Sequence, residues 1–101
     1  MPSDVRDLAD LDRLIHEPAR LALAAILSVV ETADFLYLQR ETGLTKGNLS
    51  FHLAKLDEAG YIAIEKTYRG RIPLTLVRLT EAGAAAYKAY RARFKKFLEQ
   101  T

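Results

Sequence analysis

The hydrophobic pattern of this chain changes its period once, at Gly60, and this change limits the folds open to it. Before Gly60, apolar residues recur at the three- and four-residue spacing of amphipathic helices. After it, the segment 61–68 alternates like a strand, and a second strand is expected at 74–79. A short strand near residues 32–34 would lie beside this hairpin. A long helix at about 81–100 closes the chain, so the expected fold is mainly α with one β-hairpin.

Two helices are expected in the first third of the chain. Apolar positions at helical spacing predict the first over about residues 5–16. These positions are Leu8, Leu11 and Ile15. Pro18 suits the start of a second helix, because the first helical position needs no amide donor. The segment 19–30, "ARLALAAILSVV", is apolar almost all round, which predicts a central buried helix.

Two shorter helices should follow, separated by the three residues "GLT". Asp34 can cap a helix over 35–42, and Gly43 can end it in the left-handed conformation. Thr45 can cap the next helix, 45–59. The complete order is helix, helix, helix, helix, β-hairpin, helix. Two helices joined by such a turn resemble a helix-turn-helix, whose second helix can enter the DNA major groove.

The helix 45–59 has an unusual outer face. Its core face is formed by Leu49, Leu53 and Leu56. At 100° per residue, the opposite face carries Gly47, Phe51, Ala54 and Glu58. Glycine costs about 1 kcal/mol relative to alanine in a helix interior. A face of small residues, hydroxyls, amides and one phenyl ring indicates a close external partner rather than water.

Duplex DNA is a partner that fits this face. Lys46 and Lys55 can reach phosphates or guanine, and the helix N-terminus favours a phosphate. Asn48 can pair with the N6/N7 edge of adenine, Ser50 with several base edges, and Phe51 with a thymine methyl group. The candidate DNA-binding residues on this helix are Lys46, Gly47, Asn48, Ser50, Phe51 and Lys55. The alternative is a packed helix whose Phe51 lies in a protein interface.

The tip of the hairpin, residues 66–73, carries arginines on both sides of a glycine. In a winged helix this hairpin, the wing, lies along the adjacent minor groove, whose negative potential attracts arginine. Arg69 and Arg71 are therefore further DNA-binding candidates. The alternative for this segment is a solubilising loop.

The sequence offers few residues suited to catalysis or metal binding. There is no cysteine, so disulfides and thiolate metal sites are excluded. The two histidines, His16 and His52, lack an accompanying acid cluster, and no metal or other cofactor is expected. His52 is expected to be half-buried and to hydrogen-bond within the domain or to a phosphate. No nucleophile constellation or phosphate-binding glycine loop is present, so the chain is not expected to be an enzyme.

The 101 residues suffice for one domain, 1–101, with one modest core. Residues 1–17 hold five acids and two bases, a balance of −3, whereas residues 46–78 and 79–101 each balance to +3. Adjacent base-rich segments indicate an anionic partner, although a solvated mixed-charge surface would also explain them. No apolar run is long enough to span a membrane, and the acidic start does not resemble a signal peptide. A cytoplasmic protein is expected.

The last helix is longer than one small domain needs. It carries an aromatic stripe at three- and four-residue steps, formed by Tyr87, Tyr90, Phe94 and Phe97. Part of this stripe should pack on the first helix, at Leu8, Leu11 and Ile15. The far half of a 20-residue helix, about 30 Å long, should reach a partner chain. We therefore expect a homodimer formed through the first helix and the last helix, with two recognition helices about 34 Å apart.

Two stretches together resemble the winged helix-turn-helix transcriptional regulators of the ArsR/MarR superfamily, in their small single-domain form. These are "LTKGNLSFHLAKLDEAGYI" and "YRGRIPLTLVRLTEAG", and the likeness spans about residues 11–98. The resemblance implies a homodimer that binds a pseudo-palindromic operator and usually represses transcription. It also implies base-facing roles for the residues of segment 46–51 named above, and wing roles for Arg69 and Arg71.

The resemblance leaves two matters open. Some relatives sense metals through cysteine or histidine sites that this sequence lacks, and others bind small phenolic or lipophilic effectors at the dimer junction. Nothing in the sequence names such an effector. Because folds host more than one function, a winged-helix module that binds protein and not DNA is the alternative.

Overall fold

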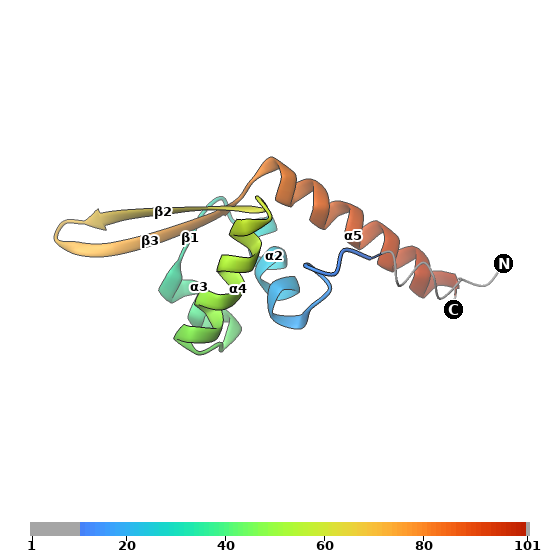
Figure 1. Cartoon of the computed structure of the whole chain (residues 1–101), viewed down its shortest axis with the longest axis horizontal. Helices are drawn as coiled ribbons and strands as arrows, with labels where there is room; N and C mark the ends of the chain where they lie inside the picture. Colours follow the sequence, from blue (N-terminus) through green and yellow to red (C-terminus); the bar gives the residue numbers. More distant parts are fainter. Residues whose placement is uncertain (1–10, 101) are drawn as a thin grey trace.

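The computed structural model describes residues 11–100 of the chain. In chain order its elements are α2 (Pro18–Val29), β1 (Ala33–Asp34), α3 (Phe35–Thr42), α4 (Lys46–Glu58), β2 (Ile62–Arg69), β3 (Ile72–Leu79) and α5 (Glu81–Gln100). Figure 1 shows α2, α3 and α4 gathered in a central body, with the β2–β3 hairpin projecting from one side and α5 from the other. The mainly α fold with a hairpin wing is confirmed.

The three strands form one antiparallel sheet in the order β1-β3-β2. The short strand expected near residues 32–34 exists, because Ala33 of β1 pairs with Val77 of β3. In the hairpin, pairing runs from Ile62 opposite Leu79 to Arg69 opposite Ile72, which leaves a two-residue turn. Its first residue, Gly70, has a φ of 65°, as a type II′ turn requires.

The main core lies between α2, α3, α4 and the near half of the hairpin. Its most buried members, all at most 1 % exposed, are Leu23, Leu38, Leu49, Leu56 and Val77. The core face predicted for the fourth helix is therefore confirmed, since Leu53 is also buried. Leu44, in the turn between α3 and α4, packs against this cluster and ties the helix-turn-helix to the core.

The described part of the expected first helix is not helical, so the prediction of a helix reaching residue 16 is wrong. Residues 11–17 form turns, and residues 5–10 lie outside the described part. The Asp12 carboxylate accepts the amides of Leu14 and Ile15, an arrangement that competes with helical hydrogen bonds. Pro18 disfavours a helical residue before it, and Glu17 is extended, with a φ of −147°.

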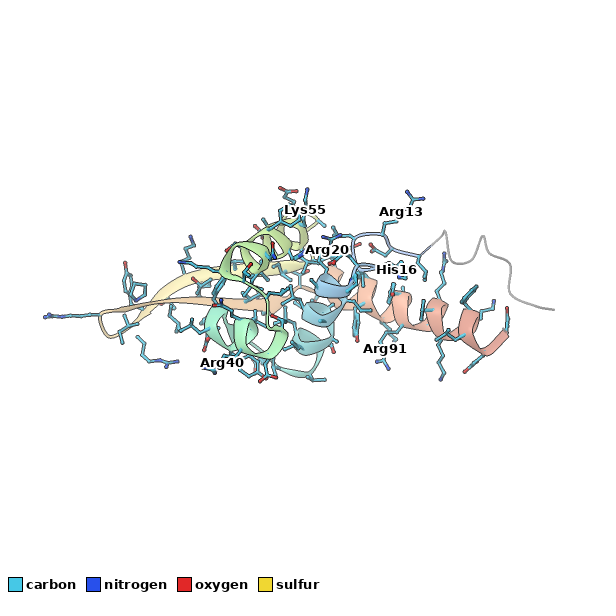
Figure 2. The ribbon with its side chains drawn as sticks, turned by 90° about the horizontal axis from the view of Figure 1, so that it is seen from below. Arg13, His16, Arg20, Arg40, Lys55 and Arg91 are labelled. Carbon is cyan, nitrogen blue, oxygen red and sulfur yellow. The ribbon has the colours of Figure 1, made fainter. Side chains whose placement is uncertain are left out.

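The turn segment 11–17 nevertheless packs on α5 as a second core cluster. Leu11, Ile15 and Tyr90 are all buried there, at 5 % exposure or less. The His16 Nδ1 atom lies 2.7 Å from the Tyr90 hydroxyl, which adds a polar contact between the segment and the helix. In Figure 2 His16 lies beside α5.

The start of α5 is held against the end of α4. The Thr80 side chain accepts the Gly83 amide and donates to the Gly60 carbonyl, at 3.0 and 2.6 Å. A Cβ atom at Gly83 would lie 1.9 Å from the Tyr61 carbonyl oxygen, so only glycine fits this crossing. The junction sets the direction in which α5 leaves the body.

The far half of α5 extends beyond the core. Between Arg91 and Gln100 no residue is buried, and Leu98 is 55 % exposed. With the wing at the opposite end, the molecule measures 59 × 26 × 21 Å. Its radius of gyration is 15.2 Å, above the value of about 13 Å typical of a compact domain of this size.

Candidate nucleic-acid interface

The turn between α3 and α4 is built by local capping. Gly43 ends α3 in the left-handed conformation, with a φ of 70°, and donates its amide to the Gln39 carbonyl. Thr45 caps α4, because its hydroxyl accepts the Asn48 amide at 3.1 Å. Both caps agree with the sequence prediction. The remaining amides of the first turn of α4 are left for solvent or an anion.

The six candidate residues on α4 are all exposed. They are Lys46, Gly47, Asn48, Ser50, Phe51 and Lys55, named here the reading face. Phe51 is 54 % exposed, so its ring is not sealed beneath the protein's own chain. A Cβ atom at Gly47 would meet nothing within 4 Å, so nothing in the described part of the chain requires glycine at this position.

Phe51 is the centre of a small cluster on the reading face. The Lys55 Nζ atom lies 5.5 Å from the centroid of its ring, a cation–π distance. The His52 ring meets Phe51 edge-on, with centroids 5.2 Å apart. The cluster combines an apolar ring with a cation, and both groups have counterparts in a DNA groove: thymine methyl groups and phosphates.

A groove of about 870 Å³ separates α4 from the wing, with α3 as its floor. Its cationic lining residues are Arg40, Lys46, Lys66 and Arg69. Two acids, Asp34 and Asp57, also line it, so its charge is positive but not uniform. Among the predicted site residues, the groove brings together Lys46, Ser50 and Arg69. The other reading-face residues lie outside it.

The wing tip presents cations and apolar side chains together. Arg69 and Arg71 are exposed on either side of the Gly70 turn. Tyr68 and Ile72 beside them are 69 % and 67 % exposed. The strands of the hairpin are eight residues each, so the tip lies about 26 Å from the base of the wing.

His52 joins the reading helix to the start of α2. Its Nδ1 atom lies 3.0 Å from Arg20 Nη1 and 3.6 Å from Glu17 Oε2. The expected half-buried histidine with a partner inside the domain is therefore confirmed. Burial raises the pKa of Glu17, but the amides of Arg20 and Ala19 oppose it and hold the pKa below its usual value.

Arg20 and Glu17 were missed by the sequence reasoning. Glu17 caps α2, because its carboxylate accepts the Arg20 amide at 2.9 Å. The signal was present, since an acid directly before Pro18 and three residues ahead of Arg20 has the spacing of an N-cap. Their contact with His52 is between elements distant in sequence, which no local pattern reveals.

The predicted dimer residues fall into two groups. Leu11, Ile15 and Tyr90 are buried within the protomer and support α5 from inside. Tyr87, Phe94 and Phe97 are half-buried. Leu8 lies outside the described residues. Tyr87 and Phe94 line a groove of about 1320 Å³ between α2 and α5, together with the buried Tyr90 and with Val29, which is 82 % exposed.

Within residues 11–100, no group of three or more acidic, histidine or cysteine side chains is arranged to hold a metal ion. In the same part of the chain, no helix combines the length and apolarity needed to cross a membrane.

A helix-turn-helix with an exposed second helix, followed by a basic hairpin, defines the class of winged-helix DNA-binding regulators. The chain belongs to the winged helix DNA-binding domain family, whose model matches residues 19–98. An uncharacterized protein of Methanocaldococcus jannaschii is 34 % identical over 79 residues, which cover 77 % of this chain and 85 % of that protein.

Two solved structures show the same fold. A transcriptional regulator homologue from Pyrococcus horikoshii has 26 % identity and a TM-score of 0.87, with 93 % of this chain and 95 % of that chain covered. A MarR-like transcription regulator from Bacillus cereus has 22 % identity and a TM-score of 0.70, with 94 % and 74 % covered. The family model makes the chain a winged-helix DNA-binding protein, and its fold is that of these two transcriptional regulators.

Proposed function

We propose that this protein is a homodimeric, sequence-specific repressor that binds a pseudo-palindromic operator in duplex DNA. The helix predicted at 45–59 enters the major groove, and the wing, residues 66–73, follows the adjacent minor groove. The observation that carries this proposal is the exposed reading face, which lacks long acidic side chains in its N-terminal two turns. The protein acts in the cytoplasm, where its operator lies, and has no catalytic role.

Different residues of the reading face contact different parts of the DNA. Lys46 and Lys55 bind phosphates or guanine, while Asn48, Ser50 and Phe51 contact base edges and methyl groups. The missing side chain at Gly47 lets the helix backbone approach the DNA closely. Arg69 and Arg71 occupy the minor groove from the wing. The whole chain, 1–101, acts as one winged-helix domain with dimerisation segments at its two ends.

The proposed dimer forms through the N-terminal segment and α5. Support comes from the far half of α5, where Phe94 and Phe97 are only half-buried and Leu98 is exposed. A second copy on this surface would cover these side chains. Two-fold symmetry would then place two reading faces about one DNA turn apart, near 34 Å.

Selection of bound fragments from a random DNA library tests the proposal directly. The expected product is an inverted repeat with half-sites about one helical turn apart. The same fragments measured at two salt concentrations should bind much more weakly at the higher salt, because bound phosphates release counterions. A protein that enriches no sequence and shows no salt dependence would instead use Phe51 as a protein-binding surface, and the proposal would be rejected.

A further inference from the structure

The hydrogen bond between Arg20 and His52 determines which imidazole nitrogen carries the proton. Arg20 Nη1 lies 3.0 Å from His52 Nδ1. A guanidinium has only donors, so the Nδ1 atom must be the acceptor. The proton of the neutral ring is then on Nε2, and His52 is a hydrogen-bond donor at its outer nitrogen.

Arg20 is well placed to hold this tautomer. Its Nε atom donates to the Leu14 carbonyl, and its backbone amide donates to Glu17. The Arg20 side chain is 14 % exposed. Figure 2 shows it between α2 and α4. With Nε bonded to the Leu14 carbonyl and Nη1 3.9 Å from Glu17 Oε2, the guanidinium keeps its donor aimed at His52 without a large entropy cost on DNA binding.

The Nε2–H donor of His52 has no protein partner within the described residues. The His52 side chain is 15 % exposed, so the donor is satisfied by water or by a ligand. Its neighbours on α4 are Phe51, which meets the ring edge-on, and Lys55, one turn further. The donor therefore lies at the rim of the reading face, between the exposed side and the core side of α4.

We propose that His52 is a phosphate-contacting residue, which donates its neutral Nε2–H to the DNA backbone and is positioned by Arg20. The inference rests on the proposed DNA-binding function and adds to it a contact that fixes the helix in the groove. A phosphate is favoured over a base because the backbone borders the groove, where the rim of a helix meets it, and because phosphate oxygens only accept.

Two substitutions separate the two ring nitrogens. His52→Asn places an amide oxygen near the position of Nδ1, so it keeps an acceptor for Arg20 but loses the outer donor. His52→Gln places its amide group near Nε2, so it keeps a donor for the phosphate but loses the contact with Arg20. We expect His52→Asn to unfold at nearly the wild-type temperature yet bind DNA about tenfold more weakly. His52→Gln should unfold at a lower temperature and lose several-fold less affinity than His52→Asn.

The salt dependence of binding tests whether the His52 donor is uncharged. A neutral donor releases no counterion, so His52→Asn should weaken binding equally at every salt concentration. Lys55→Gln is the matched control on the same helix, and its loss of a cation should reduce the slope of log affinity against log salt by about 0.9. The measurements use the full chain, at a pH of about 8, on an operator obtained by selection.

The outcomes distinguish this inference from the function on which it rests. If the wild type binds its operator and His52→Asn binds equally well, the phosphate contact is wrong and the regulator function stands. If His52→Asn lowers the salt slope as Lys55→Gln does, the ring is a cation and the neutral donor is wrong. If the wild type binds no DNA, the proposed function is wrong and this contact falls with it.

Discussion

At the scale of single residues, Gly47 is a glycine that the fold itself does not require. The contrast is with Gly83, where a Cβ atom would lie 1.9 Å from the Tyr61 carbonyl oxygen, so the fold itself demands glycine. At Gly47 a Cβ atom would meet nothing within 4 Å. A helix former would be better there for folding, so we attribute the glycine to the DNA surface proposed to approach it.

Gly47→Ala is therefore expected to raise stability and lower function. The free energy of unfolding should rise by up to about 1 kcal/mol, because alanine favours the helix. The affinity for the operator should fall, because a methyl group now stands between the backbone and the DNA. Chemical denaturation and binding titration check the two effects. Equal affinity of Gly47→Ala and wild type would refute the close approach.

Asn48 is the residue proposed to read one base. Its side chain is exposed in the N-terminal turn of α4, whereas its backbone N–H donates to the Thr45 hydroxyl. Asn48→Ala should reduce the preference at one base pair by about 1–3 kcal/mol and leave the other positions intact. Binding to a panel of single-base operator variants measures this. An unchanged panel would mean that another side chain reads the sequence.

At the scale of elements, we expect the wing to bind every DNA sequence alike. Arg69 lines the groove beside α4 and is exposed at the tip. Arg69→Ala should weaken binding to all duplexes and reduce the salt slope by about 0.9, because one phosphate contact is lost. Titrations of operator and random duplex over a series of salt concentrations give both quantities. A loss confined to the operator would assign Arg69 to base readout and contradict its backbone role.

The contact between Tyr61 and Asp12 ties segment 11–17 to the end of α4 and gives a pH signature. Tyr61 donates its hydroxyl to Asp12 Oδ2 at 2.6 Å. This bond, together with burial and the charge of Asp12, raises the pKa of Tyr61 to about 12. The unfolded value is about 10, so the stabilisation is complete below pH 10 and is lost as the pH rises through about 12.

Tyr61→Phe should therefore be less stable than wild type at about pH 8, by about 1 kcal/mol. The difference should shrink as the pH rises above about 10, because Tyr61 of the unfolded wild type ionises there, whereas the folded protein keeps it protonated up to about pH 12. Urea denaturation of both proteins across this range gives the difference. The pKa of Tyr90 is also raised by burial, but its titration is common to both proteins and cancels. A difference that stays constant with pH would exclude the Asp12 bond as its source.

Elements were predictable from sequence wherever local physics decides them. The boundaries of α3 and α4 follow from Asp34, Gly43 and Thr45, since caps depend on adjacent residues. The second strand was expected at 74–79, but β3 begins at Ile72, because pairing continues up to the turn at Gly70. The exposure of the reading face followed from helical spacing. The turns at 11–17 were not predicted. The helical spacing of their apolar residues places Leu11 and Ile15 against α5, although the segment itself is not a helix. The Arg20–His52 contact joins residues 32 positions apart, beyond any local pattern.

At the scale of the whole molecule, the fold places two projecting elements on opposite sides of a small body. The wing extends one way and α5 the other, with the reading face between them (Figure 1). An element that leaves the core exposes side chains that the same chain cannot cover. The wing exposes Arg69 and Arg71 beside Tyr68 and Ile72, whereas α5 carries half-buried Phe94 and Phe97 among exposed basic residues and exposed Leu98. We expect the two ends to bind different partners: an anion at the wing and a second copy at α5.

The dimer proposal is tested by replacing the aromatic side chains in the far half of α5 with alanine. Phe94 contacts His16 and Tyr90, with ring centroids 5.9 and 5.8 Å away, while Phe97 touches only Phe94 among the ring contacts of the described residues. Phe97→Ala should therefore weaken the dimer with little effect on the fold of the protomer, whereas Phe94→Ala should affect both. Analytical ultracentrifugation gives the dimer dissociation constant, and circular dichroism reports the fold. Operator affinity should fall with dimerisation, because half-sites are then bound singly. A double variant that still sediments as a stable dimer would place the interface elsewhere.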